Sequence, residues 1–330
     1  MFRILFSMCI SFFFCSLVQA ESTPTLTVYT YSSFISDWGP GLKIKHLFEQ
    51  QCHCQIKFKA FGDGVTLLNR LKLEGKKSKA DIIIGLDNNL IAATKSADIV
   101  QPHHITPFKN QQLSWWDEDF IPYDYGYFAF IYNRQKIINP PVSMQQLLDS
   151  NNNWRIVYAD PRTSTPGLGL LLWMQSIYGE KTAQAWHTMS QKTLTVTKSW
   201  SEAYSLFLQD EADFVLSYDT SPVAHLLNQH DDRYVAAAFS EGHYQQIEVA
   251  GIVKTTQQFD LAQQFLYFLA SNEAQYLLAI HNIMHPVIKI ALPAAFKQLM
   301  VVNKFYMMSP DMIEANRARW IETWQNAVSH

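Results

Sequence analysis

Four short turns carry the polar side chains whose types and spacing are best suited to bind a ligand. The turns comprise residues 36–41 (SDWGPG), 62–64 (GDG), 160–169 (DPRTSTPGLG) and 219–222 (DTSP). Two of them contain a hydroxyl residue directly before a proline, at Thr165-Pro166 and Ser221-Pro222, which is typical of a helix N-cap and the first helical position. Helix N-termini expose unpaired N–H groups and a partial positive charge, so these turns could bind an anion. Either pair could equally do no more than cap a helix.

A tryptophan occupies another predicted helix start. Ser199 and Glu202 have the spacing of a capping box, and Trp200 lies between them in the first turn. If this end of the helix faces a ligand, the Trp200 indole could stack on a flat or cationic molecule. Packing in the core is the alternative that applies to any single tryptophan.

No motif for catalysis or for metal binding accompanies these turns. The sequence lacks the G-x-S-x-G nucleophile elbow, the H-E-x-x-H zinc helix and the G-x-x-x-x-G-K phosphate loop. Surface or packing roles are expected for His103, His104, His281 and His285, since none has an acidic partner at ligand spacing. We therefore expect a binding protein with no catalytic residue, no metal and no cofactor.

The elements that would position the turns alternate between β-prone and helix-period segments. The β-prone runs are 26–31, 55–61, 81–86, 155–158, 214–218 and 248–253, and the first helical segments are 42–51 and 65–74. This alternation is typical of α/β architecture with parallel sheets, in which ligands bind beyond the carboxyl ends of the strands. The four turns should therefore line one crevice. From Asp260 onward the periodicity predicts a chain that is nearly all helix.

Two lobes are expected, because 330 residues are enough for two cores. The aromatic, β-prone stretch 123–132 is interpreted as the outgoing strand of a hinge, and 248–253 as the return strand. One lobe would then comprise residues 21–122 together with 254–330, and the other residues 123–253. The tyrosines of the outgoing strand would also suit a ferric-ion site, an alternative for which the sequence places no supporting carboxylate or histidine.

The N-terminus has the features of a secretory signal peptide. Arg3 precedes an apolar run that ends in Val18-Gln19-Ala20, which has the small residues of a signal-peptide cleavage site. Residues 1–20 should therefore be cleaved off. Cys52 and Cys54 would then be the remaining cysteines, in an oxidising compartment where a local disulfide is plausible. Two free thiols, or a metal site that includes His53, are the alternatives. The formal net charge of −3 argues against nucleic-acid binding, and we expect a monomer.

In its longer motifs the chain resembles the periplasmic thiamine-binding proteins, the soluble components of thiamine ABC importers. The resemblance covers most of the chain and rests on SDWGPG (36–41), GLDNNL (85–90), DYGYFAF (124–130), DPRTSTPGLGLLLWMQ (160–175), VLSYDTSP (215–222) and FSEGHY (239–244). It implies an α/β, two-lobed periplasmic binding protein fold of the class II type, with a ligand cleft between lobes joined by crossing strands. It also implies capture of thiamine or its mono- and diphosphate in the periplasm, and delivery to an inner-membrane permease with a cytoplasmic ATPase.

The resemblance also implies which residues contact the ligand. Carried over by position, the family's contacts fall on Asp63, Gly64, Ser164, Thr165, Trp200, Tyr218, Asp219, Thr220 and Ser221, with Tyr31 and Trp38 as an aromatic wall. Asp63 would accept a hydrogen bond from the aminopyrimidine, and aromatic faces would hold the cationic thiazolium. The helix starts at Ser164 and Ser221 would receive the hydroxyethyl or phosphate end. The chain departs from the family pattern at Ala224 and Ile283, where two aromatic contacts are lost.

Two other readings stay open at this point. Within the binding class, the ligand could be another cationic or phosphorylated metabolite. From a different class, secreted thiaminase of the first type shares this fold and uses a cysteine nucleophile. Cys52 and Cys54 precede the second predicted strand and lie away from the predicted crevice, which argues against that enzyme.

Overall fold

The computed structural model describes residues 23–329. The predicted signal peptide, residues 1–20, lies outside this range. Among the described helices, none is long and apolar enough to cross a membrane.

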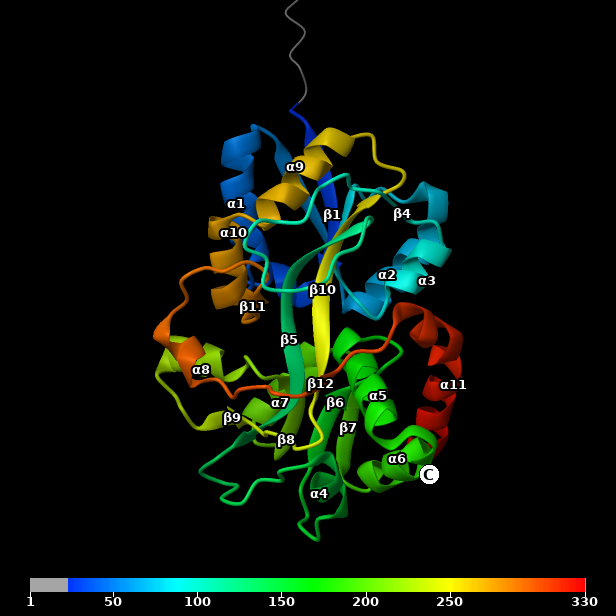
Figure 1. Cartoon of the computed structure of the whole chain (residues 1–330), viewed down its shortest axis with the longest axis vertical. Coiled ribbons are helices and arrows are strands. Elements are labelled where there is room, and N and C mark those ends of the chain that lie inside the picture. Colours follow the sequence, from blue (N-terminus) through cyan, green and yellow to red (C-terminus); the bar gives the residue numbers. More distant parts are fainter. Residues whose placement is uncertain (1–22, 330) are drawn as a thin grey trace, which may run out of the picture.

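Two groups of strands and helices are joined by two long strands (Figure 1). The first lobe contains β1 (Thr25–Tyr31), β2 (Gln55–Phe61), β3 (Ile82–Asp87), β4 (Val100–Gln101), α1 (Gly41–Cys52), α2 (Gly64–Glu74), α3 (Ile91–Ser96), α9 (Phe259–Leu269) and α10 (Asn272–Leu277). The second contains β6 (Ile156–Ala159), β7 (Thr193–Thr197), β8 (Phe214–Tyr218), β9 (Tyr234–Ala236), α4 (Met144–Asp149), α5 (Thr165–Tyr178), α6 (Thr182–Ser190), α7 (Trp200–Leu208) and α8 (Pro222–Gln229). These bounds confirm the predicted strands and early helices to within a few residues.

The strands β5 (Phe120–Asn133) and β10 (His243–Val253) run antiparallel through both lobes. The strand order is β2-β1-β3-β10-β5-β8-β6-β7, so the two long strands lie in the middle of the path. Both are predicted hinge strands, although β10 begins five residues earlier than the predicted run. The predicted lobe boundaries at 122/123 and 253/254 stay a prediction.

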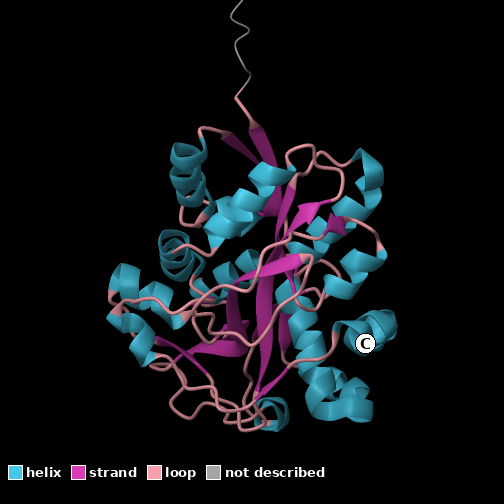
Figure 2. Ribbon diagram, turned by 45° about the horizontal axis from the view of Figure 1, so that its top comes forward, coloured by secondary structure: helices cyan, strands magenta, loops and turns pink. Residues whose placement is uncertain are grey.

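Each lobe buries its sheet on both faces, as the apolar strands require. All residues of β3 are buried. Ile82 and Ile84 belong to the cluster that includes residues of α1 and α9, whereas Ile83 belongs to the cluster that includes residues of α2. This alternation follows from the two-residue period of a strand. The helix–sheet–helix layering is visible in Figure 2.

The glycine at 169 allows α5 to approach the hinge strand β5. A Cβ atom on Gly169 would lie 1.9 Å from the ring of Phe128, which is itself fully buried. Because Phe128 cannot move away without disturbing the core, only glycine fits here. The start of α5 is thereby held beside the strand that leads from one lobe to the other.

The prediction of an almost wholly helical C-terminal third is wrong for residues 283–309. This segment contains only the short strands β11 (His285–Pro286) and β12 (Phe305–Tyr306) and a 3-10 turn, η5 (Ala294–Gln298). Pro286 and Pro293 have no backbone N–H group, so neither can donate the hydrogen bond that would continue a helix. The segment crosses to the second lobe, where β12 pairs with β10, and the last helix, α11 (Pro310–Val328), packs mainly against α6 and α3 (Figure 1). α11 thus contacts both lobes, and its assignment to the first lobe stays a prediction.

The helix caps at the two hydroxyl-proline pairs also differ from the prediction. At α5 the N-cap is Ser164, whose hydroxyl accepts from the N–H of Gly167, and Thr165 is the first helical residue. At α8 the Ser221 side chain does not cap the helix, because Ser221 already has helical backbone angles. Its hydroxyl instead accepts from the Tyr218 N–H at 3.2 Å, within the preceding turn.

Candidate functional site

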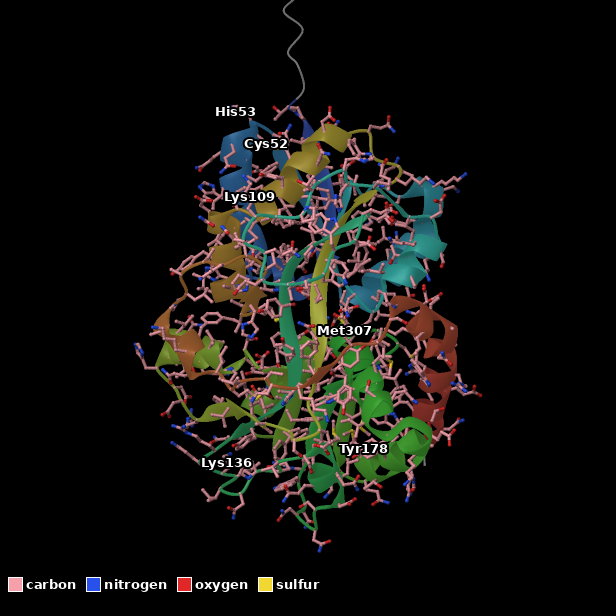
Figure 3. The ribbon with its side chains drawn as sticks, viewed as in Figure 1. Cys52, His53, Lys109, Lys136, Tyr178 and Met307 are labelled. Carbon is pink, nitrogen blue, oxygen red and sulfur yellow. A yellow bond between two sulfur atoms is a disulfide. The ribbon has the colours of Figure 1, made fainter. Side chains whose placement is uncertain are left out.

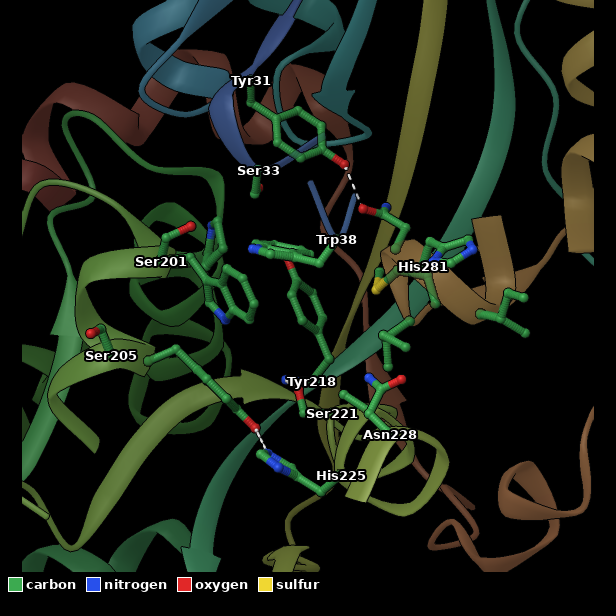
Figure 4. A pocket seen from close by; sticks show the side chains of 18 of the residues that line it. Tyr31, Ser33, Trp38, Ser201, Ser205, Tyr218, Ser221, His225, Asn228 and His281 are labelled. Carbon is green, nitrogen blue, oxygen red and sulfur yellow. Dashed lines mark hydrogen bonds between the residues drawn. The ribbon is translucent and has the colours of Figure 1, made fainter. Parts of the chain in front are cut away.

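A cavity of about 680 Å³ lies between the two lobes, against the hinge strands (Figure 4). Seven of the residues predicted to contact a ligand line it, namely Tyr31, Trp38, Asp63, Thr165, Trp200, Tyr218 and Ser221. They come from strand ends and helix starts of both lobes. The prediction that the turns share one crevice therefore agrees with where the chain places them, and the ligand contacts themselves stay a prediction.

Asp63 joins the first lobe to the second. Its side chain caps α2 by accepting from the Gly64 N–H at 2.7 Å, and it also accepts from the Thr165 hydroxyl at 3.2 Å, both on Oδ1. On Oδ2 it accepts from the Ser164 hydroxyl at 2.7 Å and the Trp200 N–H at 3.4 Å. Three helix N-termini thus point at one carboxylate, which their dipoles favour. Burial raises the pKa of Asp63, and the hydrogen bond from Ser164 opposes this rise.

Aromatic rings from both lobes form the cavity walls. Trp38 of the first lobe contacts Trp200 of the second edge to face, with ring centroids 6.2 Å apart. The Trp200 indole N–H donates to the Ser217 hydroxyl at 2.8 Å, which fixes the ring. Trp38 and Tyr218 both line the cavity (Figure 4). Trp38 is 51% exposed, so one wall of the cavity has a large aromatic face open to a ligand or to solvent.

The other four residues predicted to contact a ligand do not line the cavity themselves but contact residues that do. Gly64 and Ser164 donate to Asp63. Asp219 is 1% exposed. Its carboxylate accepts a hydrogen bond from the Tyr127 N–H at 2.8 Å and pairs with His285 at 2.7 Å. Thr220 is fully buried. These residues position the wall, and the structure does not place Asp219 or Thr220 on the cavity.

A second carboxylate, Glu248, reaches the cavity from the hinge strand β10. Its Oε2 accepts from the hydroxyls of Tyr31 and Tyr123, at 3.1 and 2.8 Å, and from Asn282 Nδ2 at 3.0 Å. Asp124 lies directly opposite on β5. Burial, and then the charge of Glu248, raises the pKa of Asp124 well above its usual value. Burial also raises the pKa of Glu248, and the hydrogen bonds that Glu248 accepts oppose this rise.

These groups also act on the phenol of Tyr218. Burial, and then the negative charges of Glu248 and Asp63, holds the pKa of Tyr218 well above its usual value. The phenol is therefore neutral and able to donate. Burial lowers the pKa values of His225 and His281, the two histidines of the cavity, so both are neutral near pH 7. The cavity thus combines aromatic rings with the carboxyl groups of Asp63 and Glu248.

Several residues that line the cavity were not among the predicted ligand contacts. They are Ser33, Asp37, Lys43, Pro166, Ser201, Tyr204, Ser205, Leu208, His225, Asn228, Gln229, Glu248, Ile280, His281, Asn282 and Met284. One signal was available for Glu248, which is a carboxylate in an otherwise apolar β-prone run. No such signal marks Asn282, which ends a short π-helix, η4 (Leu278–Asn282). Ala224 and Ile283, the two departures from the family pattern, both line the cavity.

Ile283 has a strained backbone at the edge of this cavity. Its φ of 57° and ψ of 48° lie in the left-handed region, which β-branched residues rarely adopt. Strain of this kind is found most often where a chain shapes a functional site. The neighbouring Asn282 side chain donates to both Asp124 and Glu248. The backbone turn at Ile283 therefore lies beside the residue that bonds to both carboxyl groups.

The cysteines and possible metal ligands lie elsewhere. Cys52 and Cys54 are joined by a disulfide, the first of the three alternatives. Figure 3 shows Cys52 at the top of the first lobe, and neither cysteine lines the cavity. Within residues 23–329, no group of three or more His, Cys, Asp or Glu side chains is arranged to hold a metal ion.

Comparisons with known proteins agree with this architecture. Residues 33–276 match the model of the bacterial extracellular solute-binding proteins. A thiamine-binding periplasmic protein of Escherichia coli is 51% identical over 93% of this chain and 94% of its own length. That of Haemophilus influenzae is 38% identical over 96% of both chains.

Solved structures give the same result. A periplasmic thiamin binding protein has a TM-score of 0.92 at 49% identity, covering 94% of this chain and 98% of its own. A ferric binding protein from Campylobacter jejuni, with a TM-score of 0.74 and 17% identity over 92% of this chain and 99% of its own, shares the fold alone. The expected two-lobed binding-protein fold is thus confirmed. The chain belongs to the bacterial extracellular solute-binding proteins and, among them, to the family of the thiamine-binding periplasmic proteins.

Proposed function

We propose that this protein captures thiamine in the periplasm and delivers it to an inner-membrane ABC permease driven by a cytoplasmic ATPase. It is a transport component and not an enzyme, in keeping with its family. Its location is supported by the predicted signal peptide and by relatives that are named periplasmic. We expect the protein to act as a monomer.

The observation that carries the proposal is the cavity itself. Thiamine is a flat, permanently cationic molecule, and the cavity combines the aromatic faces of Trp38 and Trp200 with the buried carboxyl groups of Asp63 and Glu248. Aromatic faces attract a desolvated cation. A volume of about 680 Å³ falls in the range of small-molecule sites.

Thiamine monophosphate and diphosphate are expected to use the same cavity. Their phosphate would enter beside the N-terminus of α5, where the hydroxyls of Ser164 and Thr165 now donate to Asp63. A phosphate there would compete with the Asp63 carboxylate for these donors. Ala224 and Ile283 line the cavity without an aromatic ring, which bears on the preference among the three forms.

Native mass spectrometry of the protein purified from periplasmic extract tests the proposal. We expect a fraction of the molecules to carry thiamine or one of its phosphates, identified by mass. A different bound cation or phosphorylated metabolite would support the alternative carrier function. Uptake of labelled thiamine should also fall in cells that lack this protein and return when it is restored.

A further inference from the structure

The two carboxyl groups on the cavity wall differ in their capacity to receive a ligand. Each oxygen of Asp63 already accepts two hydrogen bonds, from Gly64 and Thr165 on one side and from Ser164 and Trp200 on the other. A carboxylate oxygen has about two acceptor positions. With these four hydrogen bonds in place, Asp63 has no acceptor position left for the aminopyrimidine, the role that the family resemblance implied for it.

Glu248 is bonded on one side only. All three of its described donors, the hydroxyls of Tyr31 and Tyr123 and the amide of Asn282, bond to Oε2. Among residues 23–329, no N–H or hydroxyl group donates to Oε1. Glu248 lines the cavity and is only 6% exposed, so a molecule in the cavity is the partner that Oε1 can still reach.

Lys43 also lines the cavity, but no cationic side chain of the described residues pairs with Glu248. Among residues 23–329, the ion pairs that the structure contains do not include Glu248 or Asp124. The two residues face each other across the antiparallel hinge strands. Burial raises the pKa of Glu248, and the hydrogen bonds that its ionised form accepts from Tyr123, Tyr31 and Asn282 oppose this rise. A buried charge without a counter-ion is costly, and the cost is removed when a cation binds beside it.

The position of Glu248 is well defined. Tyr31 holds Oε2 from the end of β1, Tyr123 holds it from the hinge strand β5, and Asn282 holds it from the end of the π-helix η4. Figure 4 shows the Tyr31 hydroxyl reaching Asn282 at the edge of the cavity. These donors keep the carboxylate in place before a ligand arrives, so little reorganisation is needed on binding.

We propose that Glu248 supplies the counter-charge for the permanently positive ring of the ligand and thereby selects a cationic ring over a neutral one. This rests on the proposed thiamine-binding function and assigns the selection to one carboxylate that the sequence comparison had not singled out. Asp63 then serves to join the lobes, and Glu248 to recognise charge.

The test compares thiamine with 3-deazathiamine, in which a neutral thiophene replaces the thiazolium. The wild-type protein should bind thiamine at least about tenfold more tightly than the neutral analogue. The isosteric Glu248→Gln variant should lose at least about tenfold in affinity for thiamine and less than about twofold for the analogue. Glu273→Gln, an exposed residue of α10, is the matched control and should leave both affinities unchanged.

Three results would overturn the proposal. One is equal affinity of the wild-type protein for the analogue and for thiamine, a result that needs no variant. Alternatively, a folded Glu248→Gln protein could keep its affinity for thiamine, or lose the same factor for both ligands, which would give Glu248 a role in shape only. If the wild-type protein binds neither ligand, the proposed function itself has failed. Glu248→Asp, which keeps the charge, should retain more of the preference for thiamine than Glu248→Gln.

Discussion

Replacing Asp63 with asparagine should weaken thiamine binding while leaving the first lobe folded. Asparagine caps helices as well as aspartate does, so α2 keeps its N-cap. Whichever way the amide is turned, its NH2 group faces one of two fixed backbone donors, the N–H of Gly64 or that of Trp200. The hydroxyl of Ser164 can rotate to accept, but a backbone N–H cannot.

The size of the expected rise in Kd follows from the hydrogen bonds of Asp63 that join the two lobes. Ser164, Thr165 and Trp200 belong to the second lobe and Asp63 to the first, so three of the four hydrogen bonds form only when the lobes meet. A hydrogen bond to a charged group contributes about 1.5–3 kcal/mol. Losing one such bond corresponds to a roughly 10- to 100-fold higher Kd for thiamine.

Titration calorimetry measures this change, and small-angle scattering with and without thiamine shows whether the variant still closes. Asp98→Asn is the matched control, because Asp98 is exposed and pairs only with Lys254 on the surface; its Kd should stay within about twofold of wild type. A folded Asp63→Asn protein that binds and closes like wild type would refute the role of Asp63 in joining the lobes.

Three further predictions concern the wall, the disulfide and the pH dependence. Trp200→Ala should raise the Kd for thiamine by about tenfold and abolish any quenching of tryptophan fluorescence that comes from this ring; unchanged affinity would mean that Trp200 only packs. The double change Cys52→Ser and Cys54→Ser should lower the free energy of unfolding by only about 1–2 kcal/mol, because the ring is short, and should leave the Kd unchanged; a lost site would contradict this. Burial raises the pKa of Asp87 to about 7, so the folded state binds more protons than the unfolded state between about pH 4 and 7. Urea unfolding should therefore show stability falling by up to about 2 kcal/mol from pH 5 to pH 7, and Asp87→Asn should make this slope shallower; an equal slope in the variant would show that other buried carboxyl groups cause it.

The sequence predicted those parts of the site that depend on local structure. Asp63 and Thr165 follow predicted strands and Tyr218 ends one, and ligands bind beyond the carboxyl ends of parallel strands, so their convergence was foreseeable. Trp200 could be placed because a capping box fixes where its helix begins. These inferences need only the order of strands and helices along the chain.

Features that depend on tertiary contacts were not predictable in this way. The pairing of Glu248 with Asp124 requires the register of β5 against β10, which a shift of one residue would abolish. The hydroxyl of Ser221 was expected to cap α8 and instead bonds within its own turn. Residues 283–309 run from the first lobe to the second and pack on both. Helical periodicity in the sequence does not reveal such contacts.

The central claim is most directly tested by titrating the mature, ligand-free protein with thiamine in a calorimeter. We predict saturable heat with one site per chain, and competition by thiamine monophosphate and diphosphate for the same site. No heat and no thermal shift with any of the three compounds, in a protein shown to be folded and free of bound ligand, would contradict the account.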